Sequence, residues 1–162
     1  MDEATLEYYQ KNAAVIAPGN DAASAGVSAL LPFVFKPGQR VLDIGAGSGR
    51  DMARLLSLGI DAYGIEPSDS MRHQAAAAHP DLKTRLLAGH VPGGLPATLT
   101  EPWDGILLSA VIMHIPDAEL FDVALELRER LAVGGKLLVS MPESRPDVSP
   151  GETGSAPRPT PD

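Results

Sequence analysis

The architecture of this chain is indicated by one stretch, Arg40-Val41-Leu42-Asp43-Ile44-Gly45-Ala46-Gly47-Ser48-Gly49-Arg50-Asp51. A short apolar run with an acid near its end is followed by alternating glycines, and a helical pattern begins after them. Glycines lack the Cβ atoms that would keep a ligand away from the backbone, and they allow turns that are closed to other residues. A strand that ends at such a turn, before a helix N-terminus, is typical of a nucleotide-binding site.

Strands and helices alternate after this turn, which is typical of an α/β fold with a parallel sheet. The pattern predicts five strands, at residues 40–44, 60–65, 84–88, 103–109 and 136–141. It predicts helices between them at 50–58, 68–79 and 117–131, the last closed by Gly134-Gly135. Two more helices are predicted at 5–16 and 22–31, with Pro18-Gly19-Asn20 ending the first and Asp21 as the N-cap of the second.

Length and composition limit the classes of protein that this chain could represent. Its 162 residues predict one domain at 1–141, with N-terminal helices in 1–35 and a βαβ core in 36–141. The remainder, 142–162, contains six prolines and almost nothing apolar, so we expect it to be disordered.

The net charge is −8, from 21 acids against 13 Lys and Arg, which argues against a nucleic-acid partner. There is no cysteine, no secretory signal pattern and no apolar run of the ~20 residues that cross a bilayer. We therefore expect a cytoplasmic protein with no membrane partner and no metal site.

Two classes of nucleotide cofactor compete for the glycine turn. A dinucleotide fingerprint needs a third small residue where the helix packs on the strand. Counting from Gly45 places Arg50 there, and counting from Gly47 places Met52 there, so both registers fail. Glu66 ends the second predicted strand, and its carboxylate could accept hydrogen bonds from both hydroxyls of a ribose lying across the turn. That carboxylate also suits NAD, so it indicates a nucleoside rather than one particular cofactor.

Four motifs, in order and on the expected elements, resemble those of the class I S-adenosylmethionine-dependent methyltransferases. The first is residues 41–49, and the second is Gly64-Ile65-Glu66. The third joins Trp103-Asp104-Gly105-Ile106-Leu107-Leu108-Ser109 to Val111-Ile112-Met113-His114-Ile115. The fourth is Leu131-Ala132-Val133-Gly134-Gly135-Lys136-Leu137-Leu138-Val139-Ser140, with Val133 where proline is usual.

The resemblance implies S-adenosyl-L-methionine as cofactor, bound at the carboxyl ends of the strands. The family often has an acid at the position of His90, which this chain lacks. By position, the resemblance implies that the methionine moiety contacts Asp43 and the turn formed by Gly45, Ala46, Gly47, Ser48 and Gly49. It implies that Glu66 binds the ribose, and that the adenine lies against Pro67, Ser68 and Met71, with its edge at Gly89, His90 and Val91. The reacting methyl group would face Ser109 and Ala110.

Several of these residues also have simpler explanations. Asp43 could satisfy only the amides of the turn, and Glu66 could be a solvated loop acid. The catalytic residue is not identified. His114 is a weak candidate for a general base because the pKa of histidine lies near neutrality, but a histidine that starts a helical segment after strand four is more often structural. Tyr8 and Tyr9 could close over the cofactor or simply pack.

The resemblance also predicts a Rossmann-like doubly wound sheet in the order 3-2-1-4-5, with helices on both faces and without the family's C-terminal β-hairpin. Strand five would then be an open edge of the sheet, which is prone to pair with another strand. Either a partner or a second copy of the chain covers this edge, or the chain is a truncated form. We expect a methyltransferase acting on a small molecule through an O, N or C nucleophile. The alternatives are a binding-competent but inactive fragment or regulatory module and, disfavoured by Arg50 and Met52, an NAD-type oxidoreductase.

Overall fold

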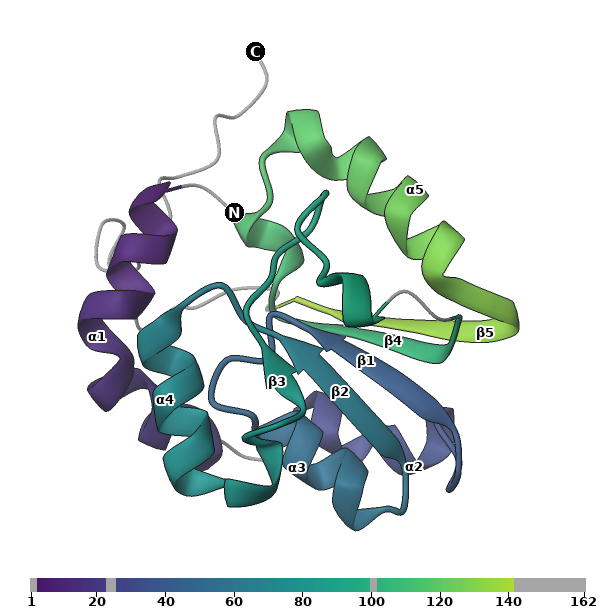
Figure 1. The fold of residues 1–162 in the computed structure, drawn as a ribbon, viewed down its shortest axis with the longest axis horizontal. Coiled ribbons are helices and arrows are strands. Elements are labelled where there is room, and N and C mark those ends of the chain that lie inside the picture. Colours follow the sequence, from purple (N-terminus) through teal and green to yellow (C-terminus); the bar gives the residue numbers. More distant parts are fainter. Residues whose placement is uncertain (1–2, 23–25, 100–101, 142–162) are drawn as a thin grey trace.

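A computed structural model describes residues 3–22, 26–99 and 102–141, and the predicted disordered segment 142–162 lies outside them (Figure 1). The described chain forms a five-stranded sheet in the order β3-β2-β1-β4-β5, and every neighbouring pair is parallel. The predicted strand order is confirmed. The strands are β1 (Arg40–Ile44), β2 (Asp61–Ile65), β3 (Leu86–Leu87), β4 (Trp103–Ser109) and β5 (Leu131–Ser140).

Helices cover both faces of the sheet, because side chains alternate between the two faces along each strand. Leu42 and Ile44 of β1 pack with the α5 side chains, whereas Val41 packs with those of α2 and α3. The α-helices are α1 (Glu3–Ala22), α2 (Leu31–Val34), α3 (Arg50–Ser57), α4 (Asp69–Ala78) and α5 (Leu120–Arg130). Short 3-10 helices occur at η1 (Val27–Ala29), η2 (Pro80–Leu82), η3 (Ala97–Leu99), η4 (Ile112–His114) and η5 (Asp117–Glu119).

The N-terminal helices differ from those predicted. The prediction that Pro18-Gly19-Asn20 ends the first helix is wrong, because α1 continues through Pro18 to Ala22. A proline inside a helix removes one backbone hydrogen bond, but Ala13 and Ala17, in the turn before Pro18, are buried against Met71 of α4 and stabilise the helix there. The predicted helix at 22–31 with Asp21 as N-cap is also wrong, since Asp21 lies in α1 and the later segment forms η1 and α2.

The segment around Gly134-Gly135 also differs from its prediction. It does not close a helix: α5 ends at Arg130, and both glycines lie inside β5. The pairing of β4 with β5 shifts register between Trp103 and Gly105, and a Cβ on Gly135 would lie 3.0 Å from the Trp103 carbonyl oxygen. The glycines therefore allow a bulge that lets the strand start five residues earlier than the apolar pattern indicates.

The described residues contain no helix that is long and apolar enough to span a membrane.

Candidate functional site

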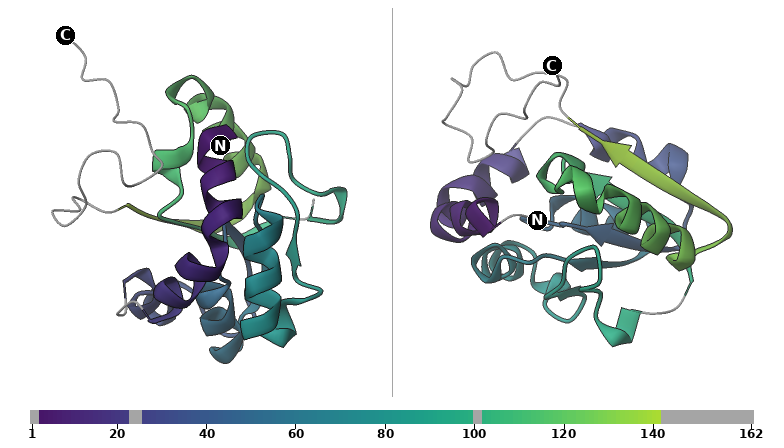
Figure 2. Two further views of the ribbon diagram at one scale, coloured as in Figure 1. Left: turned by 90° about the vertical axis from the view of Figure 1, so that its left-hand side faces the viewer. Right: turned by 90° about the horizontal axis from the view of Figure 1, so that it is seen from above.

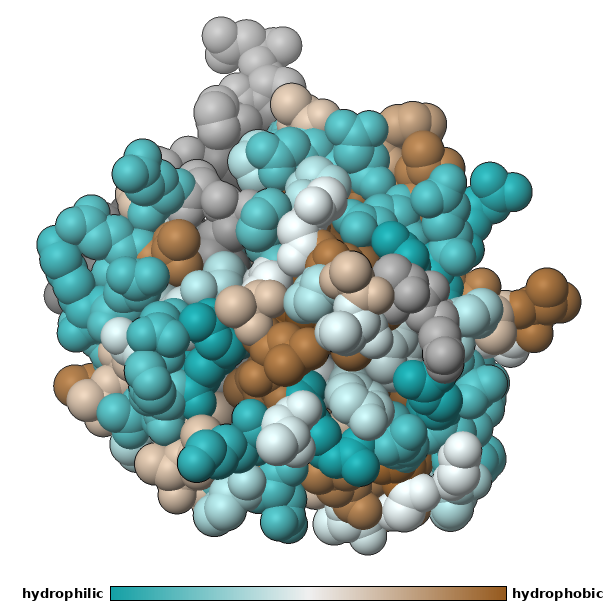
Figure 3. All heavy atoms as spheres, viewed as in Figure 1, coloured by the Kyte–Doolittle hydropathy of each residue, from teal (hydrophilic) through white to brown (hydrophobic). Residues whose placement is uncertain are grey.

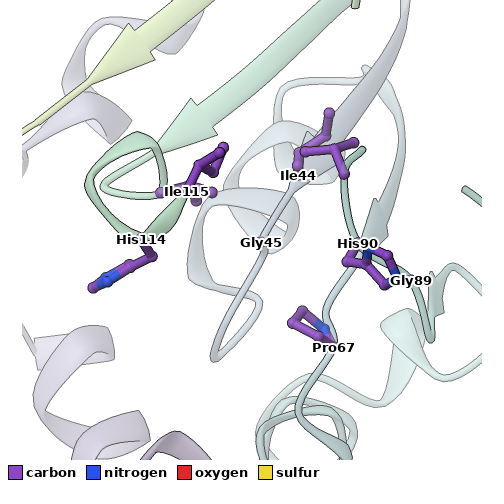
Figure 4. A pocket seen from close by; sticks show the side chains of 9 residues that line it. Ile44, Gly45, Pro67, Gly89, His90, His114 and Ile115 are labelled. Atoms are coloured by element: carbon purple, nitrogen blue, oxygen red, sulfur yellow. The ribbon is translucent and has the colours of Figure 1, made fainter. Parts of the chain in front are cut away.

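The carboxyl ends of four strands meet around one pocket. In the sheet register, Ile44 pairs with Ile65 and Ile65 with Leu87, so β1, β2 and β3 end side by side. The pocket is small, because the space inside it that water can reach is about 20 Å³, which is room for about one water molecule (Figure 4). It is lined by Ile44, Gly45, Pro67, Gly89, His90, Val91, Val111, His114 and Ile115. Figure 3 shows hydrophobic side chains gathered near the centre of the molecule in the view of Figure 1, bordered by hydrophilic ones.

The glycine turn forms one wall of this pocket. Gly45 has a φ of 70°, and a Cβ at this residue would lie 2.6 Å from Cγ2 of Val111. Any side chain at Gly45 would therefore strain the backbone and strike the opposite wall. The turn is fixed to β2, because the amides of Gly45 and Ala46 donate to the Ile65 carbonyl at 2.8 and 3.0 Å. Gly49, with a φ of 80°, is the N-cap of α3.

Glu66 is buried and links the glycine turn to the start of α4. Its Oε2 accepts a hydrogen bond from the Gly47 amide at 3.0 Å, and its Oε1 accepts one from the Ser68 amide at 2.8 Å. Burial raises the pKa of Glu66, while the two amides and the nearby Arg72 oppose that rise. Each carboxylate oxygen has a further lone pair, so the group can still accept hydrogen bonds from a ligand. The alternative of a solvated loop acid is wrong, because Glu66 is only 5% exposed.

Asp43 is the second buried carboxyl group beside the turn. It is 1% exposed, and within the described part of the chain its Oδ1 has no hydrogen-bond partner. Burial raises the pKa of Asp43 well above its usual range, and the neighbouring Asp51 and Glu66 raise it further. A buried acceptor without a donor is costly, so this oxygen suits a ligand group that carries a hydrogen-bond donor or a positive charge.

The unliganded protein should therefore gain stability when Asp43 cannot ionise. For a carboxyl group whose pKa is raised by folding, its contribution to stability is fully present below the unfolded value near 4 and is lost as the pH rises through the folded pKa. Asp43→Asn is expected to melt at a higher temperature than the wild type at neutral pH, and the difference should shrink as the pH falls toward about 4.

Differential scanning fluorimetry across that pH range measures this difference, with the exposed Asp81→Asn as control. A lower melting temperature for Asp43→Asn at neutral pH would mean that the carboxylate has a stabilising partner.

Some of the predicted site residues line the pocket, and others make different contacts. Gly45, Pro67, Gly89, His90 and Val91 line it, while Ala46, Gly47, Ser48 and Gly49 complete the turn that bounds it. Ser68 instead caps α4, its Oγ accepting from the Met71 amide at 3.3 Å, and Met71 packs against Ala13 and Ala17. Neither Ser109 nor Ala110 lines the pocket, and the Ala110 amide donates to the Ser140 carbonyl.

Three lining residues were not among those predicted. Ile44 follows Asp43 directly, and Val111 and Ile115 come four residues apart after β4. Their apolar side chains gave no chemical signal, although Val111 and Ile115 lie within the third motif. Their side chains make part of the pocket wall apolar, and in Figure 4 Ile115 lies across the pocket from Pro67 and His90.

His114 lies at the end of η4 and lines the same pocket. Its Nε2 is 3.3 Å from the Tyr9 hydroxyl oxygen, with which it forms a hydrogen bond. The two rings meet edge-on, with centroids 5.6 Å apart. Tyr9 therefore connects α1 to the pocket wall, whereas Tyr8 contacts only the Tyr9 ring among the aromatic pairs of the described chain.

Comparison with known proteins gives consistent matches. A family model described as "Methyltransferase domain" matches residues 16–160. A protein-L-isoaspartate O-methyltransferase from Methylorubrum populi is 31% identical over 141 residues, which cover 85% of this chain and 62% of that protein. A protein of the same description from Xylella fastidiosa is 30% identical, and the match covers 85% of this chain and 59% of that protein. This chain thus spans about three fifths of the length of these curated relatives.

Solved structures agree on the fold. The glycopeptide N-methyltransferase MtfA, complexed with sinefungin, is 26% identical with a TM-score of 0.59, and the match covers 73% of this chain and 50% of that one. A TehB-like SAM-dependent methyltransferase from Corynebacterium glutamicum is 20% identical with a TM-score of 0.65, over 83% of this chain and 71% of that one.

Proposed function

The chain belongs to the class I S-adenosylmethionine-dependent methyltransferases, and on that premise we propose that it transfers the methyl group of S-adenosylmethionine to a small-molecule acceptor. The observation that carries the proposal is the glycine turn, which contributes Gly45 to the pocket wall and has the two buried carboxyl groups of Asp43 and Glu66 next to it. The acceptor contributes an O, N or C nucleophile, which attacks the methyl group in line with the departing sulfur.

The residues present suit this cofactor. The Glu66 carboxylate, held by two amides, would bind the ribose hydroxyls, and the turn from Gly45 to Gly49 would take the methionine moiety. The Oδ1 of Asp43, two residues before that turn in sequence, is buried without a hydrogen-bond partner among the described residues and would favour a donor or a cation. Pro67, His90 and Val91 would enclose the adenine. The bound cofactor supplies an activated methyl group, and the chain holds the reactants in line, which can account for much of the rate enhancement.

The small size of the pocket favours a small acceptor over a protein chain. Helix α1 stands in front of the carboxyl ends of the strands in Figure 2, and Tyr9 on it is hydrogen-bonded to His114 of η4. A protein carboxylate is the second candidate acceptor, favoured by the descriptions of the relatives that are about 30% identical. The net charge of −8 argues against nucleic acid as acceptor.

Methyl transfer from labelled S-adenosylmethionine tests the proposal. The purified chain is incubated with a panel of small amines, phenols and carboxylates, and in parallel with an isoaspartyl peptide, and products are identified by mass spectrometry. Label in a small molecule supports the proposal. Label only in the peptide supports the second candidate. Binding of S-adenosylhomocysteine without transfer to any acceptor would contradict turnover and favour a cofactor-binding module.

The open edge of β5 leads us to propose that two copies of the chain associate there. Within the described sheet β5 pairs only with β4, and Leu137 and Val139 on it are 45% and 39% exposed. Figure 3 shows apolar atoms projecting at the side where Figure 1 places the start of β5. An unpaired apolar strand edge can pair with another strand. In a symmetric dimer that strand is β5 of the second copy.

Leu137→Lys is therefore expected to convert a dimer into a monomer, because a lysine on an edge strand opposes pairing. Gel filtration with light scattering over a range of concentrations measures the mass. Leu125→Lys, on α5 at a similar exposure of 41%, is the matched control and should leave the dimer intact. A wild-type chain that remains monomeric at every concentration would contradict the pairing.

A further inference from the structure

A second and larger hollow lies between α5 and β5, on the side of the sheet where Figure 1 shows this helix. We define this α5–β5 groove by the residues on its two sides, Leu120, Ala124 and Leu127 of α5 and Leu137 and Val139 of β5. The space inside it that water can reach is about 580 Å³, within the range of small-molecule sites, against about 20 Å³ beside the glycine turn. The two hollows share no lining residue, so the groove is separate from the cofactor pocket.

The lining of the α5–β5 groove is apolar. Apart from Arg128, every described residue that contributes to it is aliphatic or glycine. Leu127 is buried, whereas Leu137 and Val139 remain 45% and 39% exposed. Removing such side chains from water is favourable, so an apolar ligand in the groove would gain affinity from them. Pairing of two β5 edges would leave this surface open, because strands pair through backbone groups in the plane of the sheet while side chains point to its faces.

Arg128 is the one charged side chain among the described residues of the lining, and it is exposed. No ion pair or hydrogen bond joins it to any residue that the structure describes. The acids of α5 point elsewhere or stay outside the lining. Glu126 accepts a hydrogen bond from the Gly93 amide at 2.8 Å, and neither Asp122 nor Glu129 contributes to the groove. The groove therefore combines an apolar hollow with a cation that no acid in its lining neutralises.

We propose that the α5–β5 groove binds a free long-chain carboxylate, with the alkyl chain between α5 and β5 and the carboxylate at Arg128. Arginine suits this position because its stem lies along apolar surface while its guanidinium stays in water. The hollow form favours a flexible alkyl chain over a second copy of the protein, since a protein surface would need a protruding element to fill the same space to interior density. The proposal does not depend on the proposed function, because the two sites share no residue.

Calorimetric titration of the full chain with octanoate, decanoate, dodecanoate and tetradecanoate, each below its micelle concentration, tests the proposal. The dissociation constant should fall about fourfold for each added methylene until the groove is full. Dodecanol, which is neutral, should bind about two- to fivefold more weakly than dodecanoate. Dodecyltrimethylammonium should bind more weakly still. An affinity that does not depend on chain length, or equal binding of the cation and the carboxylate, would overturn the proposal.

Arg128→Gln tests the carboxylate contact. It should weaken dodecanoate binding by about two- to fivefold and leave dodecanol binding unchanged. Lys136→Gln is the matched control, because it removes the same charge from β5 outside the groove lining, where Lys136 Nζ donates to the Val34 carbonyl at 2.8 Å. This control should bind dodecanoate as the wild type does. Equal losses for the two variants would mean that only the net charge matters, which would overturn the contact with Arg128.

Ala124→Phe tests the hollow, because it places a large side chain inside the groove from an exposed position of α5. It should abolish binding of dodecanoate and dodecanol alike. Ala77→Phe, the same change at an exposed position of α4, is the matched control and should bind both as the wild type does. Unchanged dodecanoate binding by Ala124→Phe would overturn the proposal, and a changed mass by light scattering in that variant would assign the groove to contact between copies. Thermal melting confirms that each variant is folded, and Arg128→Gln is decisive if Ala124→Phe is not.

Discussion

Replacing Glu66 with alanine is expected to weaken the binding of S-adenosylhomocysteine by at least about 100-fold, because hydrogen bonds to a charged group contribute about 1.5–3 kcal/mol each and two to the ribose would be lost. The same change removes the acceptor of the Gly47 and Ser68 amides, which loosens the turn that forms the pocket wall. Isothermal titration calorimetry measures the affinity.

The matched control for Glu66 is another acid in the same region. Asp69 begins α4 three residues later, but its side chain is 66% exposed and pairs with Arg72. Asp69→Ala should bind the ligand as the wild type does. Glu66→Gln, which keeps an acceptor oxygen but loses the charge, should lie between the wild type and Glu66→Ala. Unchanged binding by Glu66→Ala would mean that Glu66 does not bind the ribose.

Gly45→Ala is expected to destabilise the protein by about 2–5 kcal/mol, the sum of left-handed backbone strain and overpacking. Its Cβ would lie 2.6 Å from Val111 Cγ2 and would also narrow the pocket, so ligand binding should be lost as well. Urea unfolding measures the stability, and calorimetry measures the binding.

Gly47→Ala separates the two causes. Gly47 has a φ of 55°, so alanine there suffers the same backbone strain, but the nearest atom to its Cβ is Met71 Cε at 3.7 Å, an ordinary contact. We expect a loss of only about 1–2 kcal/mol. Equal losses for the two variants would show that contact with Val111 is not what requires glycine at residue 45.

Local patterns predicted the elements around the glycine turn well. The predicted bounds of β1 and β4 match the structure, because each is a buried apolar run that ends at a turn or a polar residue. The predictions failed where tertiary contacts override local preference. Pro18 lies within α1, and Gly134-Gly135 lie within β5, because packing on α4 and pairing with β4 stabilise those conformations.

The site was predictable as far as its chemistry appears in local motifs. The motifs place Asp43 and Glu66 at neighbouring strand ends, and the structure shows both to be buried beside the turn. Two features depend on the folded chain. Ser68 is a plausible ligand by position but is occupied as a helix cap. Tyr9 and His114 meet only because α1 folds across the sheet, and no spacing in the sequence indicates a contact over 105 residues.

The glycine turn can serve several nucleotides, so the identity of the ligand is the decisive question for this site. Calorimetric titration of the purified wild-type chain with S-adenosylhomocysteine and, separately, with NADH under the same conditions answers it. We predict saturable binding of S-adenosylhomocysteine, no binding of NADH, and stabilisation by about 2.7 kcal/mol at a ligand concentration 100 times the dissociation constant. Binding of NADH without binding of S-adenosylhomocysteine would contradict the assignment of this pocket.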